Sequence, residues 1–179
     1  MPYISEISSS KPSDLGNATA GKVYDILDQL GIPYECVTND VVETMEECRE
    51  LDEKLGVQIR KSLFLCDRKK TRFFLVVLPD DKSIKTKELG RKIGVSNPSF
   101  APAEYMEKCL GALPGSASAM GLVNDEGNEV ELVIDREVAD AEYFGCNAGI
   151  TTTHLKMKTS DLLERFLPEI HHRPEILEI

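Results

Sequence analysis

The chain has 179 residues, of which 41% are hydrophobic, and a formal net charge of −10. This length is enough to bury one core and predicts a single domain. No apolar run is long enough to cross a membrane, and the first residues lack the charged start and apolar centre of a secretion signal, so we expect a cytoplasmic protein. A uniformly acidic surface repels phosphate, which argues against DNA and other nonspecific nucleic-acid partners.

The cysteine pattern predicts reduced thiols. The chain has five cysteines, an odd number, with no Cys-x-x-Cys pair. This pattern fits buried thiols better than a disulfide framework or a zinc site, so no metal or cofactor is expected. Cys146 stands apart from the others, because it adjoins a motif discussed below. The cysteines are Cys36, Cys48, Cys66, Cys109 and Cys146.

The first part of the chain predicts a helix, a strand and a second helix. Residues 1–14 are rich in Ser and Pro without periodicity, which is typical of a loose arm before a domain at 15–179. Apolar residues at helical spacing predict a helix over 20–30, and a short strand follows at 34–37. The sequence Thr44-Met-Glu-Glu47 resembles a capping box and predicts a second helix that ends near Gly56.

The middle of the chain predicts a hairpin and two helices. Residues 62–66 and 73–78 are apolar runs joined by a charged turn, which is typical of a buried antiparallel pair. Helices are expected over 86–93 and 102–110, the second with proline in its first turn.

The last third predicts three strands and a helix. The strands are expected over 130–134, 142–146 and 152–157, and the helix over 160–166, ended by Pro168. Runs of strands flanked by helices indicate an α/β or α+β domain around a mixed, curved sheet.

Positive charge is concentrated in residues 60–92, which hold eleven Lys and Arg against four Asp and Glu. Four of the basic residues surround one turn. They form either a solvated hairpin and helix face or a surface that faces phosphate. The four residues are Arg68, Lys69, Lys70 and Arg72.

Residues 110–121, Leu-Gly-Ala-Leu-Pro-Gly-Ser-Ala-Ser-Ala-Met-Gly, form a loop of small residues, called here the small-residue loop. Glycine lets a backbone approach a ligand closely, proline fixes a turn, and serine adds a small hydroxyl, so the loop is a candidate pocket floor. An ordinary helix-to-strand connection remains the alternative. Likewise, Lys61 opens an apolar strand and is either a site residue or a lysine in water.

Two motifs, which follow one another along the chain, resemble those of the YbaK/ProX family. Its members are the free-standing relatives of the editing domain in bacterial prolyl-tRNA synthetases. The two motifs are the lysine-led strand at 61–65 and the loop at 110–122, and the similarity extends from about residue 20 to 167. Family members usually carry a His-Pro-x-x-Asn motif on a late strand. Asn147, Ala148 and Thr151 stand in place of its His, Pro and Asn.

The resemblance implies a trans-acting deacylase that hydrolyses mischarged aminoacyl-tRNA, with alanyl-tRNA(Pro) as the leading substrate and prolyl-tRNA synthetase as a candidate partner. It implies that Lys61 is catalytic and that Arg68, Lys69, Lys70 and Arg72 bind the tRNA acceptor end. The residues expected to bind substrate are Gly111, Pro114, Gly115, Ser116, Ser118, Met120, Gly121, Asn147 and Thr151.

Covalent catalysis is not the first expectation, because the three histidines lie late in the chain and no Ser-His-Asp set can be assembled. His171 and His172 are expected in solvent, and His154 is a weak candidate for substrate contact. An activated ester needs only a placed water, backbone N–H donors and a nearby cation. A silent relative that binds aminoacyl-tRNA or a small amino acid as a regulator remains the alternative, favoured by the changes at 147, 148 and 151.

Overall fold

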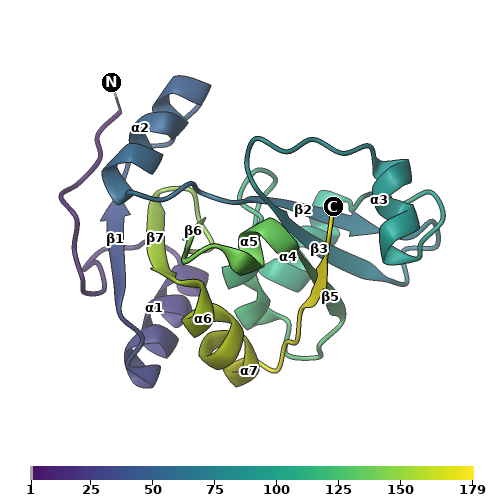
Figure 1. Ribbon diagram of the computed structural model, residues 1–179. Helices are drawn as coiled ribbons and strands as arrows, with labels where there is room; N and C mark the ends of the chain where they lie inside the picture. Colours follow the sequence, from purple (N-terminus) through teal and green to yellow (C-terminus); the bar gives the residue numbers. More distant parts are fainter. Residues whose placement is uncertain (1) are drawn as a thin grey trace.

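The computed structural model describes residues 2–179 and has the mixed α/β architecture expected from the sequence (Figure 1). The helices and strands are, in chain order, α1 (Ala18–Leu30), β1 (Tyr34–Thr38), α2 (Met45–Leu55), β2 (Lys61–Cys66), β3 (Phe73–Leu78), α3 (Thr86–Ile93), β4 (Ser99–Phe100), α4 (Ala103–Leu110), η1 (Ala119–Asn124), β5 (Val130–Asp135), α5 (Arg136–Asp140), β6 (Tyr143–Asn147), β7 (Thr153–Lys158), α6 (Thr159–Asp161), η2 (Leu162–Phe166), α7 (Leu167–Glu169) and β8 (Glu175–Leu177).

The first two helices begin and end where their capping residues predict. The Asn17 side chain accepts from the first turn of α1, and Gly31 ends this helix in the left-handed conformation. The capping box of α2 is complete: Thr44 Oγ1 accepts from the Glu47 backbone N–H, and a Glu47 carboxylate oxygen accepts from the backbone N–H of Thr44.

The strands form two sheets, where the sequence predicted one. A five-stranded mixed sheet has the order β4-β2-β3-β5-β8, and an antiparallel three-stranded sheet has the order β1-β7-β6. The two meet at an isolated bridge between Ile59 and Gly145, and the Arg60 N–H donates to the Gly145 carbonyl oxygen at 2.9 Å. In Figure 1 the two sheets occupy opposite sides of the molecule, and β2 leaves this junction toward α3.

The two faces of the five-stranded sheet are buried in different clusters. Strand β3 is buried at every position. Phe73 and Leu75 point into the main core, which also packs against α1 and the C-terminal helices. Phe74 and Val76 point into a smaller cluster covered by α3. A strand buried on both faces needs the continuous apolar sequence Phe-Phe-Leu-Val-Val-Leu found here.

The C-terminal region differs from the prediction in two ways. The helical segment does not end before Pro168 but continues through α7 to Glu169. It contains a π-helical turn in which the Leu167 N–H bonds to the Leu162 carbonyl oxygen, and Pro168 lies at the next helical start, where a missing N–H is tolerated. Residues 175–177 then add β8 in parallel to β5, a strand the sequence did not reveal.

His172 is buried, contrary to its expected place in solvent. Its side chain is 1% exposed, with Nε2 2.9 Å from a carboxylate oxygen of Asp125 and Nδ1 2.7 Å from the Ile170 carbonyl oxygen. Asp125 also accepts from the backbone N–H groups of Glu129 and Val130. This contact attaches the end of the helical segment to the turn before β5.

The N-terminal segment lies along β1. The backbone N–H groups of Ser5 and Ser8 donate to the carbonyl oxygens of Thr38 and Cys36, at 2.8 and 2.9 Å. The segment forms isolated bridges but no helix or strand of its own within residues 2–14. Among residues 2–179, no helix has the length and apolarity required to span a membrane.

Candidate functional site

A cavity of about 790 Å³ opens where the start of β2, the small-residue loop, the end of β6 and the start of β7 come together. Its size lies within the range of small-molecule sites. We call it the Lys61 cavity. Its wall includes seven of the predicted site residues, namely Lys61, Gly111, Pro114, Gly115, Ser116, Asn147 and Thr151.

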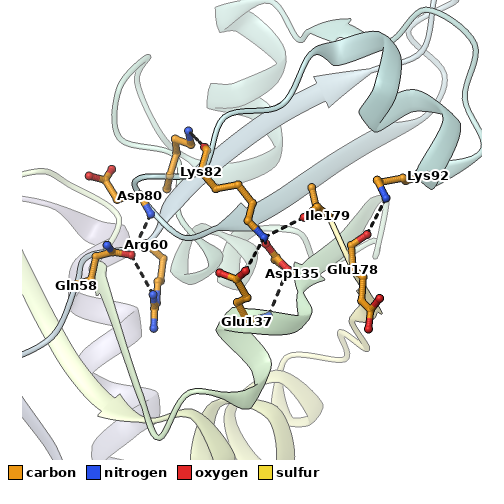
Figure 2. A network of polar contacts seen from close by, with 10 residues as sticks. Gln58, Arg60, Asp80, Lys82, Lys92, Asp135, Glu137, Glu178 and Ile179 are labelled. Atoms are coloured by element: carbon orange, nitrogen blue, oxygen red, sulfur yellow. Dashed lines mark hydrogen bonds and ion pairs between the residues drawn. The ribbon is translucent and has the colours of Figure 1, made fainter.

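Lys61 is half-buried at the first position of β2, and its ammonium donates to the backbone carbonyl oxygen of Lys82. Lys82 is itself fixed: its Nζ lies 2.6 Å from Asp135, 3.1 Å from Glu137 and 2.9 Å from the Ile179 carbonyl oxygen. These contacts raise the pKa of Lys82, with the hydrogen bond to Asp135 as the largest cause. Figure 2 shows Lys82 reaching toward these three groups from the loop after β3.

Arg60 adds a second cation to the wall of the Lys61 cavity. One guanidinium nitrogen donates to Gln58 Oε1 at 3.0 Å, and Gln58 also accepts from the Asp80 N–H, as Figure 2 shows. The Nε of Arg60 is buried and has no partner among the described residues. Burial lowers the pKa of Arg60, which indicates a charge held partly away from water. Its positive charge favours an anionic group or a developing negative charge in the cavity.

The part of the small-residue loop that lines the cavity is held by its own backbone. Gly111 ends α4 with φ of 61°, and a Cβ at this position would lie 2.4 Å from the Asn124 side chain. Gly115 has φ of 92°, which side-chain-bearing residues rarely adopt. The Ser116 hydroxyl accepts from the Leu113 N–H at 3.0 Å and donates to the Leu113 carbonyl oxygen at 2.7 Å. These features fix a tight turn at the cavity wall.

The last residues of the loop lie behind the wall. Ser118 is 3% exposed; its hydroxyl donates to the Asn147 carbonyl oxygen and accepts from the Met120 N–H. Met120 is fully buried in the main core, because η1 begins at Ala119 and turns the chain inward. A Cβ on Gly121 would lie 3.0 Å from Leu110, so this glycine allows a close approach within the protein and not to a ligand. These three expected substrate contacts therefore support the wall without lining it.

The positions that differ from the family motif lie at the end of β6. Asn147 is 8% exposed, and its side-chain oxygen accepts from the Gly149 N–H at 2.9 Å. Ala148 is fully buried, and Thr151 is half-buried in the cavity wall. Asn147 thus shapes the turn between β6 and β7 while part of it faces the cavity.

His154 lies directly opposite Asn147 in the β6–β7 register and also lines the cavity. Its Nδ1 is 2.9 Å from the Asn39 side-chain oxygen. Burial lowers the pKa of His154 to about 4, so the ring is neutral at neutral pH. No carboxylate bonds to this ring within residues 2–179, so the site has no Ser-His-Asp arrangement there.

The basic turn, residues 68–72, lies at the opposite end of the β2–β3 hairpin from Lys61. Arg72 is already paired: two of its nitrogens contact Glu131 at 2.9 and 3.0 Å, and its guanidinium lies over the Phe74 ring. The hydrogen bond to Glu131 raises the pKa of Arg72. Arg68, Lys69 and Lys70 are exposed. Only these three of the four predicted tRNA-binding residues are without a described ion-pair partner.

Exposed apolar side chains surround the cavity mouth. Val41, Phe100 and Leu113 line the cavity, yet they are 57%, 63% and 68% exposed. An exposed ring next to a cavity offers a flat surface on which a nucleic-acid base can stack. Phe100 supplies this ring from β4, at the edge of the five-stranded sheet.

All five cysteines are free thiols, as the sequence predicted. Cys146 is buried and lies outside the cavity wall, and its burial raises the thiol pKa. Cys48 lines the cavity, but burial raises its thiol pKa as well. Neither thiol is set up as a nucleophile, because the reactive species is the thiolate.

Sequence reasoning gives little or no weight to four residues of the site. In the sequence Arg60 is only one member of a basic segment, and Phe100 lies between the two family motifs without a signal of its own. His154 and Asn39 lie 115 positions apart, and only the antiparallel pairing of β1 with β7 brings them together. The available signal for His154 is its place on a strand next to the strand that carries Asn147.

Comparisons of the chain with known protein families and relatives agree with the geometry of this site. Residues 40–164 match the aminoacyl-tRNA editing domain family. The chain is 39% identical over 112 residues to the prolyl-tRNA editing protein ProX of Acetoanaerobium sticklandii, covering 63% of this chain and 68% of that protein. It is 30% identical over 158 residues to prolyl-tRNA synthetase associated domain-containing protein 1 of Danio rerio, covering 87% and 85%.

A solved structure has the same fold. It is described as a candidate trans-editing enzyme for prolyl-tRNA synthetase, with a TM-score of 0.63 and 16% identity, and the match covers 93% of this chain and 99% of that one. At 16% identity this similarity is evidence for the fold and not for the function. The match over residues 40–164 includes the Lys61 strand, the small-residue loop and the β6–β7 turn. The chain belongs to the aminoacyl-tRNA editing domain family.

Proposed function

We propose that the protein is a trans-acting deacylase that hydrolyses the ester of mischarged aminoacyl-tRNA, with alanyl-tRNA(Pro) as its substrate. The observation that carries the proposal is the convergence of Lys61 and the small-residue loop on one cavity. The matches to ProX and to the editing domain family support it. Since the substrate is charged tRNA, the proposed place of action is the cytoplasm.

The charge of the cavity supports ester hydrolysis. Arg60 and Lys61 line it, and no Asp or Glu does so within the described residues. In the proposed reaction water attacks the ester carbonyl carbon, negative charge develops on the carbonyl oxygen, and the ribose oxygen leaves. Lys61 stabilises that charge, with the backbone N–H of Gly115 as a further donor, whereas the Ser116 N–H already donates to the Leu113 carbonyl oxygen. The hydroxyl next to the ester on the terminal ribose assists by passing the proton that the attacking water gives up to the leaving ribose oxygen.

The small residues of the wall support selection by size. A synthetase that binds proline discriminates against smaller alanine by only ~1–3 kcal/mol, so a second site that excludes the larger residue is required. The aminoacyl group lies against Gly111, Gly115 and Ala117 in our proposal, and the terminal adenine stacks on Phe100. The exposed Arg68, Lys69 and Lys70 bind phosphates further along the acceptor end. Association with prolyl-tRNA synthetase would deliver the substrate.

The experiment is a deacylation assay on tRNA charged with alanine, serine, cysteine or proline. The proposal predicts fastest hydrolysis of alanyl-tRNA(Pro) and little hydrolysis of prolyl-tRNA(Pro). Binding without hydrolysis of any of these esters would favour the second candidate, a regulator that holds aminoacyl-tRNA. The changes at Asn147, Ala148 and Thr151, and the contact that holds the Lys61 ammonium on Lys82, are the observations that favour that candidate.

A further inference from the structure

The imidazole of His154 faces the Lys61 cavity. One ring nitrogen is hydrogen-bonded to the protein, and the other has no described hydrogen-bond partner. The residue is 5% exposed and lines the cavity wall. Nδ1 contacts the Asn39 side-chain oxygen at 2.9 Å, and no group within residues 2–179 hydrogen-bonds to Nε2. Nε2 is not among the fully buried atoms that lack a partner, so it keeps accessible surface at the cavity wall and can hydrogen-bond to a bound molecule.

The contacts of Asn39 determine which nitrogen carries the proton. The Asn39 amide nitrogen donates to the carbonyl oxygens of Asp40 and Thr151, at 2.8 and 2.9 Å. Carbonyl oxygens only accept, so the amide cannot be turned around, and its oxygen must face His154. Nδ1 therefore donates to this oxygen. Because burial keeps the ring neutral, Nε2 presents an unprotonated lone pair to the cavity.

Three other polar side chains of the wall already accept hydrogen bonds from the protein. The side-chain oxygen of Asn17 accepts from the Ala20 N–H, and that of Asn147 from the Gly149 N–H, both at 2.9 Å. The Ser116 hydroxyl accepts from the Leu113 N–H at 3.0 Å. No carboxylate lines the cavity among the described residues. The neutral imidazole is thus a rigidly held acceptor that cannot donate from Nε2, in a wall that also presents two cations and the hydroxyls of Ser62 and Thr151.

We infer that Nε2 of His154 accepts a hydrogen bond from the α-amino group of the aminoacyl ester. This inference rests on the proposed function. The ester carries a carbonyl oxygen, which the cations Arg60 and Lys61 suit, and an α-amino group, which requires an acceptor. His154 is the residue placed to supply it, and Asn39 is a positioning residue that fixes the ring. The contact would distinguish a free α-amino acid ester from an acyl group that lacks the amine.

The test uses two stable analogues of the charged tRNA end, in which an amide replaces the ester. One is adenosine with an alanylamido group on the 3′ carbon, and the other carries a propionylamido group, which lacks the α-amino nitrogen. Calorimetry on the wild-type protein should give about tenfold tighter binding of the alanyl analogue, the effect expected of one hydrogen bond of about 1.4 kcal/mol.

Two variants isolate the acceptor. His154→Asn keeps a donor near the position of Nδ1 for Asn39 but removes Nε2, and the preference for the alanyl analogue should disappear. His154→Gln places an amide oxygen near the position of Nε2 and should restore part of it. An undiminished preference in His154→Asn, or an equal loss of affinity for both analogues, would overturn the inference.

A spectroscopic measurement tests the ring itself. Long-range ¹H–¹⁵N spectra of the wild-type protein at neutral pH should show the proton of His154 on Nδ1, and a proton on Nε2 would contradict the inference. Failure of the wild-type protein to bind either analogue would overturn the proposed function, and the inference with it. Binding of both with equal affinity would overturn the inference alone.

Discussion

The ammonium of Lys61 donates a hydrogen bond to the backbone carbonyl oxygen of Lys82. Lys82 in turn is held by the carboxylate of Asp135, which is 1% exposed. The lysine at the cavity is therefore positioned by a loop whose own position depends on a half-buried ion pair. The consequence is that residues outside the cavity influence the orientation of Lys61.

Asp135→Asn should lower the free energy of unfolding by about 1–2 kcal/mol. Removing one partner of a fully buried pair costs about 3–5 kcal/mol. The loss expected here is smaller, because Lys82 is partly exposed and keeps its contacts with Glu137 and the Ile179 carbonyl oxygen. Asparagine retains the capping contact to the Glu137 N–H. Urea unfolding measures the change. Glu137→Gln is the control and should change stability by less than about 0.5 kcal/mol, because Glu137 is largely exposed. Equal losses in both variants would show that Asp135 is not the anchor.

The basic turn should contribute to tRNA binding through Lys69 and Lys70 but not through Arg72. Replacing both lysines by alanine should reduce the slope of log affinity against log salt by about 1–2, since each neutralised phosphate contributes about 0.7–0.9. Arg72→Ala should leave the slope unchanged, because Arg72 is paired with Glu131. Binding of charged tRNA over a salt series measures both. A larger change in slope for Arg72→Ala than for the lysine pair would reject this assignment.

The stability of the protein should fall between pH 7.5 and 5.5 partly because of His154. Its pKa is lowered to about 4 in the folded state, against about 6.5 when unfolded, so the unfolded state binds the proton first and is favoured as the pH falls. The expected contribution over this interval is about 1 kcal/mol. His154→Asn should show a smaller fall than the wild type in urea unfolding at the two pH values. Parallel falls in the two proteins would mean that His154 titrates normally when folded.

Two substitutions to leucine in the small-residue loop should have different effects. Ser118→Leu should destabilise the fold by about 2–4 kcal/mol, because it overpacks the core and leaves the Asn147 carbonyl oxygen and the Met120 N–H unpaired. Ala117→Leu, at a half-buried position in the cavity wall, should retain the fold but slow hydrolysis of the alanyl ester. Thermal unfolding and the deacylation rate, measured on both variants, separate the two effects. Full activity of a folded Ala117→Leu protein would show that this wall does not contact substrate.

Much of the fold could be predicted from local sequence signals. The helix at 86–93 matches its predicted bounds, and the capping box at Thr44 and the glycine at 31 mark true helix ends. What local patterns could not supply was pairing over long distances. Strand β8 is defined by its pairing with β5, and residues 175–177 contain no sequence pattern that predicts a strand.

The site, like the fold, could be predicted only where a local sequence motif marks it. Lys61 and the first half of the small-residue loop were identified from motifs, and the structure brings them to one cavity. Ser118 and Met120 could not be separated from the rest of the loop by residue type, because small and apolar residues line a pocket and fill a core equally well. His172 was missed because its partner Asp125 lies 47 positions earlier.

The most direct test of the account is the rate at which wild-type protein and Lys61→Ala hydrolyse alanyl-tRNA(Pro), at saturating and at limiting substrate. If Lys61 stabilises the developing charge, the variant should be slower by about 10²-fold or more, the range found when one preorganised donor is removed. Its thermal unfolding should match that of the wild type closely enough to exclude loss of folding. Equal rates for the two proteins at both concentrations would contradict the account.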